Sequence, residues 1–232
     1  MCPTILHKCR SVALKARCDT RAIETGVVDD MTGFMFGKMK ATDMAHTVWR
    51  HIVRGGDFVI DATCGNGHDT LALAKMVREE SRKGLVYGMD LQQSALQNTS
   101  ALLDSTLTPI EREQVKLFPL CHSKMEELVP EGVSVRLVFR LVAFNLGYLP
   151  GGNKEIITTS KTTLLGLDAA ARVLSSGGLI SIMSYVGHPG GREEYEAVRS
   201  YASNLPATMW VSSEHDILNR PSGPVLIFLF KR

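Results

Sequence analysis

Two acidic residues and a pair of glycines have the types and spacing of a site for a nucleotide-like ligand. Asp61 ends an apolar run at residues 58–60, and Gly65 and Gly67 follow before apolar positions resume in a helical pattern. Glycine lets the backbone turn tightly and approach a ligand, while the first N–H groups of the helix face the turn. The pattern therefore predicts the strand–turn–helix junction at which doubly wound folds bind their ligands.

The same region distinguishes between two classes of ligand. A dinucleotide site prefers a third glycine in G-x-G-x-x-G, but Thr70 occupies that position here. S-Adenosylmethionine has no pyrophosphate, and its ammonium group can pair with an acid such as Asp61. Asp90 ends the next predicted strand and can accept both ribose hydroxyls, in charge-assisted hydrogen bonds of roughly 1.5–3 kcal/mol each. Helix capping is the alternative role for the two acids, but together with the glycines they favour S-adenosylmethionine.

The composition predicts one domain, at residues 40–232, preceded by an N-terminal arm at 1–39. The chain has 232 residues and is 44% hydrophobic, enough for a sizeable core. No apolar run approaches the roughly 20 residues of a membrane span, so we expect no membrane partner. The net charge of +2 neither requires nor excludes nucleic acid, and RNA binding would need a local basic patch.

The cysteines and the N-terminus bear on metal binding and location. The five cysteines show no C-x-x-C spacing, so no metal site is expected, and Cys64 inside the glycine turn is interpreted as a small neutral filler. The first 18 residues contain four basic residues and no acidic one. This resembles the end of an organellar transit peptide, although serine is sparse, and a frayed basic terminus is the alternative.

Strand and helix patterns alternate from residue 40 onward, which predicts a mostly parallel α/β sheet. Helices are expected at 42–54, from the glycine turn to about 78, and at 92–103, 159–175 and 192–203. Strands are expected at 58–61, 85–89, 115–120, 135–144, 179–185, 208–213 and 225–230. The last two strands are joined by a loop too short for a crossover helix, so they should form an antiparallel hairpin at one edge. This predicts a Rossmann-like class I methyltransferase fold with seven strands and helices on both faces.

The loop after the fourth strand carries the residues expected to handle a substrate. Asn145 and Tyr148 have the spacing of the N-P-P-Y motif of methyltransferases that act on exocyclic amines. There the Asn amide accepts a hydrogen bond from the target N–H and holds the nitrogen lone pair toward the methyl group, while Tyr offers a flat surface for a base. A glycine-rich connector with a capping Asn is the alternative, but the carboxyl end of a central strand favours function.

Other polar residues are predicted at the same rim. Tyr185 and His188 end the fifth strand and could contact substrate, and His188 could take the proton of a protonated amine. The alternative for His188 is a loop residue making one backbone bond. His122 and Ser123 follow the third strand, where such folds usually hold the adenine ring.

The start of the first helix after the glycine turn, and the helix before the first strand, add further candidates. His68 and Asp69 could cap the helix or contact the methionine carboxylate. Asp69 alone would repel that carboxylate, so capping is the better explanation for it. His46 and Trp49 could cover the ligand, with core packing the safer interpretation of Trp49.

Three motifs together resemble a known family: D-A-T-C-G-N-G-H-D-T at 61–70, N-L-G-Y-L-P-G-G-N-K at 145–154 and Y-V-G-H-P-G-G at 185–191. Over residues 46–232 the chain is similar to the bacterial rRNA methylase family whose characterised members are tRNA 5-aminomethyl-2-thiouridine methyltransferases. The resemblance implies that S-adenosylmethionine methylates the aminomethyl nitrogen of the wobble uridine, with the tRNA anticodon stem-loop as partner and no metal. A homodimer is also compatible with it. Plant organelles are of bacterial descent, so a chloroplast or mitochondrial location would suit the basic N-terminus, with the cytoplasm otherwise.

The resemblance also implies which residues do what. By motif position, the cofactor would be lined by Asp61, Thr63, Gly65, Asn66, Gly67, His68, Asp69, Asp90, Leu91, Gln92, His122, Ser123 and Asn145. The target nucleotide would face Asn145, Tyr148, Tyr185 and His188. An RNA path along Lys154, Lys161, Arg192 and Arg199 is expected from loop position. One departure from the family is Arg140, which interrupts a strand expected to be buried.

Three other interpretations stay open. A methyltransferase acting on an rRNA base or a small amine would share the cleft chemistry, because the fold does not fix the substrate. A non-catalytic cofactor-binding subunit of an RNA-modification complex is disfavoured by the intact loop motif. A nicotinamide dehydrogenase is disfavoured by Thr70 and the terminal hairpin.

Overall fold

The computed structural model describes residues 32–79, 84–128, 139–153 and 155–232. The chain divides into two compact units, Met1–Lys40 and Ala41–Arg232. In the first unit, the described part contains a helical turn at residues 32–35. The stretch whose composition resembles a transit peptide lies outside the described residues.

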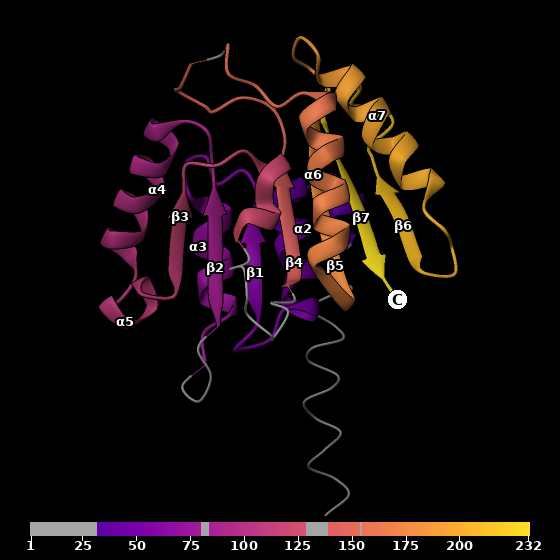
Figure 1. Ribbon diagram of the computed structural model, residues 1–232. Helices are drawn as coiled ribbons and strands as arrows, with labels where there is room; N and C mark the ends of the chain where they lie inside the picture. The colour runs from indigo at the N-terminus through magenta and orange to yellow at the C-terminus, as the bar shows by residue number, and fades with distance from the viewer. Residues whose placement is uncertain (1–31, 80–83, 129–138, 154) are drawn as a thin grey trace, which may run out of the picture. The chain divides into compact units, whose positions relative to one another are not determined.

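The second unit is built on a seven-stranded sheet with the order β3-β2-β1-β4-β5-β7-β6 (Figure 1). Its strands are β1 Phe58–Asp61, β2 Leu85–Met89, β3 Val115–Phe118, β4 Phe139–Asn145, β5 Leu174–Tyr185, β6 Trp210–His215 and β7 Pro224–Lys231. The pairs from β3 to β5 are parallel, and β7 runs antiparallel to both β5 and β6. The predicted mostly parallel sheet with an antiparallel hairpin at one edge is confirmed.

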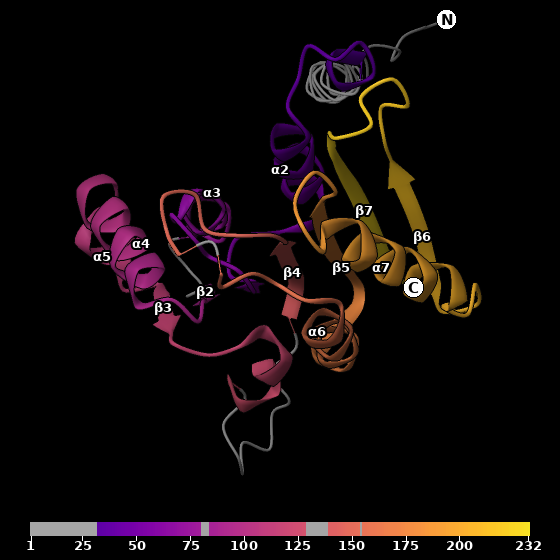
Figure 2. The same ribbon diagram turned by 90° about the horizontal axis from the view of Figure 1, so that it is seen from above.

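The helices connect these strands and cover the sheet. They are α2 Ala41–Ile52, α3 His68–Met76, α4 Gln93–Thr106, α5 Pro109–Arg112, the 3-10 helix η1 His122–Leu128, α6 Ser160–Val173 and α7 Gly191–Asn204. Figure 2 shows α2 and α3 on one face of the sheet and α6 on the other. Among the residues described, no helix is long and apolar enough to cross a membrane.

The strand order creates a single point where ligands are expected. The chain winds from β1 outward to β3 and then returns to β4 on the other side of β1. In doubly wound sheets the crevice at such a switch point, beyond the carboxyl ends of the strands, is the ligand site. The central strands are buried, as Ile60, Leu141 and Ile180 show with none of their surface exposed. This core fixes the positions of the residues that follow β1, β2 and β4.

Some boundaries differ from the prediction for identifiable reasons. Strand β5 begins at Leu174 and not at residue 179. Gly177 lies within it with a φ of +73°, and the pairing with β4 shifts register between Phe139 and Leu141. A glycine pair normally indicates a turn, so the sequence pattern hid this part of the strand. The predicted start of β4 at residue 135 lies outside the described residues.

Two short helices, α5 and η1, were not predicted from the sequence. Helix α5 is a single turn with a capping box formed by Thr108 and Glu111, and η1 is an irregular 3-10 segment; both are too short for an apolar period.

Arg140, which departs from the family pattern, is accommodated near the start of β4 by two polar contacts. Its side chain pairs with Asp57 at 3.6 Å and donates to the Ser176 carbonyl at 3.4 Å.

Candidate functional site

The turn between β1 and α3 has a conformation that requires its glycines. Gly65 and Gly67 have φ values of +52° and +87°, in the left-handed region that favours glycine. A Cβ at Gly67 would lie 2.9 Å from the Cα of Thr99 on α4, so space also excludes a side chain there. Thr99 Oγ1 donates to the Gly65 carbonyl at 2.9 Å and holds the turn in place. Thr99 was not predicted, because no local pattern marks it.

Asp61 is a buried acid at the carboxyl end of β1, with 1% of its surface exposed. Thr70 Oγ1 donates to its Oδ2 at 2.6 Å, and the Thr63 N–H donates to Oδ1 at 3.3 Å. Burial, and next the charge of Asp69, raise the pKa of Asp61 from 3.8 to about 7. Thr70 thus replaces the third glycine of a dinucleotide site with a hydroxyl that supports an acid. Such a carboxylate gains from a cationic partner, which fits the ammonium group of S-adenosylmethionine.

Asp90 joins the glycine turn to the end of β2. Its carboxylate accepts from the Gly65 N–H at 3.0 Å and from the Gln92 N–H at 2.9 Å. A carboxylate offers about four lone-pair sites, so Asp90 keeps acceptor capacity for hydroxyl groups. Leu91 beside it is an exposed apolar side chain, with 60% of its surface accessible. A carboxylate beside an apolar surface could hold the ribose and base of the cofactor, and contact of Asp90 and Leu91 with the cofactor stays a prediction.

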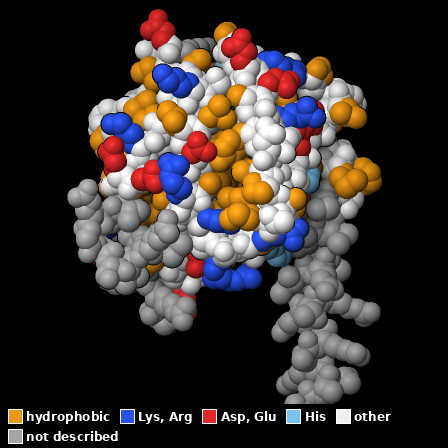
Figure 3. All heavy atoms as spheres, turned by 45° about the vertical axis from the view of Figure 1, so that its right-hand side comes forward, with side chains coloured by type: hydrophobic (Ala, Val, Ile, Leu, Met, Phe, Trp, Pro, Cys, Tyr) orange, Lys and Arg blue, Asp and Glu red, His pale blue; other side chains and the backbone are white. Residues whose placement is uncertain are grey.

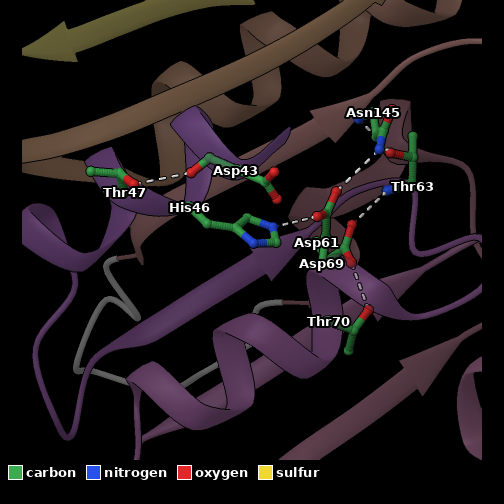
Figure 4. A network of polar contacts seen from close by, with 8 residues as sticks. All are labelled: Asp43, His46, Thr47, Asp61, Thr63, Asp69, Thr70 and Asn145. Carbon is green, nitrogen blue, oxygen red and sulfur yellow. Dashed lines mark hydrogen bonds and ion pairs between the residues drawn. The ribbon is translucent and has the colours of Figure 1, made fainter. Parts of the chain in front are cut away.

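A chain of hydrogen bonds links α2, α3 and β4 (Figure 4). His46 Nε2 lies 2.6 Å from Oδ1 of Asp69, and Asn145 Nδ2 donates to Oδ2 of Asp69 at 3.1 Å. The favoured explanation of Asp69 as a helix cap is therefore wrong, because both of its oxygens are engaged by side chains outside α3. Trp49 is buried with 3% of its surface exposed, and its ring lies 4.7 Å from that of His46. Core packing is confirmed for Trp49.

Asn145 stands at the carboxyl end of β4, at the switch point. Its N–H donates to Thr63 Oγ1 at 2.7 Å, which ties the end of β4 to the glycine turn. Gly147 follows with a φ of +128°, and Tyr148 comes next with 42% of its surface exposed. The loop thus presents an amide and an exposed aromatic ring beside the carboxylates, as an amine-directed motif requires.

His188 and Tyr185 flank this loop at the end of β5. The His188 ring lies edge-on to Tyr148, with ring centroids 5.9 Å apart. Its Nδ1 is 3.0 Å from the Pro189 carbonyl, which only accepts, so Nδ1 carries the proton. Nε2 is then a bare acceptor, buried and without a hydrogen-bond partner. This geometry matches the single backbone bond of a loop residue, so proton transfer by His188 stays a prediction. Tyr185 is 36% exposed, and burial and the charge of Asp69 raise its pKa.

Other predicted residues lie around this centre with different contacts. His122 is buried at 6% exposure, and burial lowers its pKa from 6.5 to about 4. Its ring meets Phe144 edge-on at 5.7 Å, and the absence of a side chain at Gly166 on α6 lets it pack there. Ser123 Oγ donates to Cys121 Sγ at 3.1 Å. Contact of His122 and Ser123 with the cofactor stays a prediction.

The remaining predicted residues lie on the solvent side of the glycine turn or inside it. Asn66 Nδ2 donates to the Pro150 carbonyl at 3.3 Å, which joins the glycine turn to the loop after β4 that carries Tyr148. His68 is exposed at the start of α3. Burial strongly raises the pKa of the Cys64 thiol, in agreement with a neutral filler. Within the described parts of the chain, no group of three or more His, Cys, Asp or Glu could hold a metal ion.

The expected RNA path finds little support in the charges. Lys154 lies outside the described residues. Arg192 pairs with Glu196 at 3.8 Å and Arg199 with Glu214 at 3.0 Å. Figure 3 shows basic and acidic side chains interspersed on the face it displays. The path along these cations stays a prediction.

Comparisons with known proteins show the family of this chain. A family described as "Putative rRNA methylase" matches residues 86–231. The "tRNA (mnm(5)s(2)U34)-methyltransferase, chloroplastic" of Arabidopsis thaliana is 56% identical over 89% of this chain and 75% of that protein. A "putative rRNA-methylase" structure from Clostridium thermocellum is 32% identical, covering 84% of this chain and 98% of that one, with a TM-score of 0.75. The structure of "a putative methyltransferase from streptococcus mutans in complex with SAH" is 28% identical, covering 84% of this chain and 99% of that one, with a TM-score of 0.71. The chain therefore belongs to this rRNA methylase family, and it is a methyltransferase with a Rossmann-like fold.

Proposed function

We propose that the chain methylates the aminomethyl nitrogen of a modified wobble uridine in tRNA, converting 5-aminomethyl(-2-thio)uridine to 5-methylaminomethyl(-2-thio)uridine. The observation that carries this proposal is the hydrogen bond from Nδ2 of Asn145, at the carboxyl end of β4, to Asp69 on α3. With Nδ2 engaged, the amide oxygen of Asn145 is left as a neutral acceptor suited to an amine N–H, near the acids expected to hold the cofactor. The name of the Arabidopsis thaliana relative supports the same substrate.

The residues of the chain would divide the work as follows. Asp61 would pair with the ammonium group of the cofactor, and Asp90 would accept from its ribose hydroxyls. S-Adenosylmethionine supplies an electrophilic sulfonium methyl group when bound. Asn145 would accept one N–H of the neutral amine, so that the nitrogen lone pair is left for the methyl carbon. Positioning of this kind supplies much of the rate in a one-step displacement.

The exposed rim would hold the nucleotide. Tyr148 offers a flat surface on which the uracil ring can stack, and base stacking of this kind is worth roughly 1–3 kcal/mol. Tyr185 lies at the end of the neighbouring strand, where it would bound the same pocket. The anticodon stem-loop would be the part of the tRNA that enters the site. Assembly as a homodimer is a further proposal that follows from the resemblance alone.

The location of the protein is proposed with the function. The Arabidopsis thaliana relative is described as chloroplastic, and the first 18 residues of this chain are basic and free of acid. We therefore propose a plant-type organelle, a chloroplast or a mitochondrion, as the location of the enzyme. Import of a fusion of residues 1–39 to a fluorescent protein would test this.

The proposed function is tested by methyl transfer from labelled S-adenosylmethionine to tRNA that carries aminomethyl-thiouridine, followed by mass spectrometry of the digested nucleosides. We expect a new methylaminomethyl nucleoside, and none with an unmodified transcript of the same tRNA. Parallel reactions with rRNA and with the free aminomethyl nucleoside separate the other substrates. Transfer to either of these but not to tRNA, with cofactor binding intact, would contradict the proposal.

A further inference from the structure

The two hydrogen bonds of Asp69 determine which end of the Asn145 amide faces the substrate. Oδ2 of Asp69 receives Nδ2 of Asn145 at 3.1 Å, and Oδ1 lies 2.6 Å from His46 Nε2. An ionised carboxylate only accepts hydrogen bonds, so both partners must donate. The NH2 end of Asn145 is thereby assigned to Asp69, and its carbonyl oxygen faces away from the carboxylate.

This orientation matters because an amide can rotate to present either end. With the carbonyl oxygen outward, Asn145 accepts an N–H of the target amine and leaves the lone pair of the nitrogen free. With the amide reversed, two donors would meet and the amine would lose its acceptor. Asp69 is a group that distinguishes the two orientations, because only one of them gives its Oδ2 a donor.

His46 in turn holds Asp69. Its ring packs against Trp49, which is buried in the core, so the imidazole comes from a fixed position on α2. The side chains of His46 and Asp69 have 21% and 15% of their surface exposed, so the pair is shielded from solvent. The donor from His46 also occupies one oxygen of Asp69. A free carboxylate would hold the substrate as an ammonium ion, which cannot attack.

We propose that His46 is a positioning residue for methyl transfer, acting through Asp69 to keep the carbonyl oxygen of Asn145 toward the target amine. The proposal rests on the proposed function, in which Asn145 accepts an N–H of that amine. It assigns to α2 a part in the chemistry, although this helix precedes β1 and the glycine turn.

The kinetic test compares substitutions at two histidines of the same helix. His46→Leu removes the donor, His46→Gln keeps a side-chain N–H, and His51→Leu makes the same change at an exposed position outside the network. We expect His46→Leu to lower kcat by roughly tenfold or more, as expected for loss of a charge-assisted hydrogen bond, with the KM for S-adenosylmethionine within about twofold. His46→Gln should recover most of kcat, and His51→Leu should equal the wild type. An unchanged kcat in His46→Leu, or equal losses in His46→Leu and His46→Gln, would overturn the proposal.

A second measurement does not depend on the substrate. In the 15N-labelled free protein, the side-chain amide resonances of Asn145, identified by their absence in Asn145→Asp, should shift in His46→Leu and stay in place in His51→Leu. If His46→Leu does not fold, Asp69→Ala replaces it, because it removes the acceptor of Asn145 Nδ2, and the same loss of kcat is expected. Unshifted Asn145 resonances would refute the positioning role even where the wild type methylates tRNA. Failure of the wild type to methylate any aminomethyl-tRNA, with S-adenosylmethionine bound, would instead refute the proposed function.

Discussion

At the scale of single residues, Asp61 shows a conflict between stability and ligand binding. Burial, and next the charge of Asp69, disfavour the ionised form of its carboxyl group in the free protein, and they outweigh the hydrogen bond from the Thr70 hydroxyl, which favours that form. A cationic ligand would also favour the ionised form. Sites that a protein keeps for function are often ones that lower its stability. Asp61 is such a site, and its pKa makes the conflict measurable.

Asp61→Asn tests this conflict. Because the folded-state pKa is raised from 3.8 to about 7, the folded protein holds a proton that the unfolded chain releases, and stability falls as pH rises through that window. The substitution removes the buried charge, so we expect Tm of the variant relative to wild type to be higher at pH 8 than at pH 5. In a chain of this size, each change of about 1 kcal/mol in the free energy of unfolding shifts Tm by about 2–4 °C. Scanning calorimetry at both pH values checks this, and an equal Tm difference at the two would contradict it. The same variant should lose S-adenosylmethionine binding.

Asp90 and Tyr148 are expected to separate cofactor binding from transfer. Asp90→Ala removes the carboxylate that accepts from Gly65 and Gln92 and that would accept from the ribose. We expect its affinity for S-adenosylmethionine to fall by tenfold or more, on the order of one charge-assisted hydrogen bond. Tyr148→Ala should bind the cofactor like wild type and lose transfer to tRNA. Titration calorimetry with S-adenosylmethionine measures the cofactor affinity of both variants, and the tRNA methylation assay measures transfer. Wild-type affinity in Asp90→Ala would show that the assignment of Asp90 is mistaken.

At the scale of elements, the parts of the fold with a repeated pattern could be predicted from the sequence. Alternating strands and helices indicated the parallel sheet, and the short connection before Val225 indicated the antiparallel hairpin. The glycine turn was predictable because two glycines follow a buried strand that ends in an acid. Strand β5 was predicted too short because Gly177 and Gly178 resemble a turn, and α5 was missed although Thr108 and Glu111 have the spacing of a capping box.

The contacts between elements could not be predicted in the same way. Asp69 lies 23 positions after His46 and 76 before Asn145, and no local spacing indicates that these three side chains meet. Thr99 supports the glycine turn from α4, at 34 positions from Gly65. Such pairs are decided by how helices pack on the sheet. The sequence therefore indicated which residues carry chemistry, but not which residues hold them in place.

Glu194 on α7 is the clearest example of such a supporting residue. Its side chain is buried, with 2% of the residue exposed, and its two oxygens accept from Thr158 Oγ1 at 2.7 Å and Thr163 Oγ1 at 2.6 Å. Thr158 Oγ1 in turn accepts from the Gly147 N–H at 2.8 Å. One carboxylate thus joins α7, α6 and the loop that carries Tyr148. Buried charge that is fully hydrogen-bonded can hold one arrangement of such elements.

Glu194→Ala should weaken the hold on the loop that carries Tyr148 without changing the affinity for the cofactor. We expect a loss of about 1–3 kcal/mol in the free energy of unfolding, because the buried Thr163 hydroxyl and the partly buried Thr158 hydroxyl lose their acceptor. The KM for tRNA should rise while the affinity for S-adenosylmethionine stays unchanged. Glu194→Gln keeps one acceptor, so its stability and its KM for tRNA should lie between those of the wild type and Glu194→Ala. Glu193→Ala is the control at an exposed neighbour. Urea unfolding and steady-state kinetics measure these effects. If the KM for tRNA of Glu194→Ala equals that of the wild type, Glu194 does not position the loop that carries Tyr148.

At the scale of the whole molecule, neither the net charge nor the face displayed in Figure 3 identifies an RNA surface. The net charge is +2, and the face shown in Figure 3 mixes basic and acidic side chains. Ion pairs such as Arg199 with Glu214 cancel much of the local field. Recognition of tRNA is therefore expected to depend on the exposed aromatic rim around Tyr148 more than on long-range attraction, and binding should weaken only modestly with added salt.

Two buried groups titrate in the same pH range with opposite effects on stability. His122 has its pKa lowered from 6.5 to about 4, so the unfolded chain takes up the proton first and stability falls as pH falls through this window. Asp61 has its pKa raised from 3.8 to about 7, so the folded protein takes up the proton first and stability rises as pH falls. The two windows overlap almost completely, and the shifts are of similar size.

We therefore expect the wild-type protein to show a nearly flat profile of stability between pH 4.5 and about 6.5 from these two groups, and each single variant to remove one side of the balance. Asp61→Asn leaves His122 alone, so its urea midpoint should fall as pH falls. His122→Gln leaves Asp61 alone, so its midpoint should rise as pH falls. Urea unfolding of the three proteins across this range measures the slopes directly. Parallel slopes in all three would mean that neither buried group titrates as its surroundings require, because burial, the largest cause of both pKa shifts, gives the two slopes opposite signs.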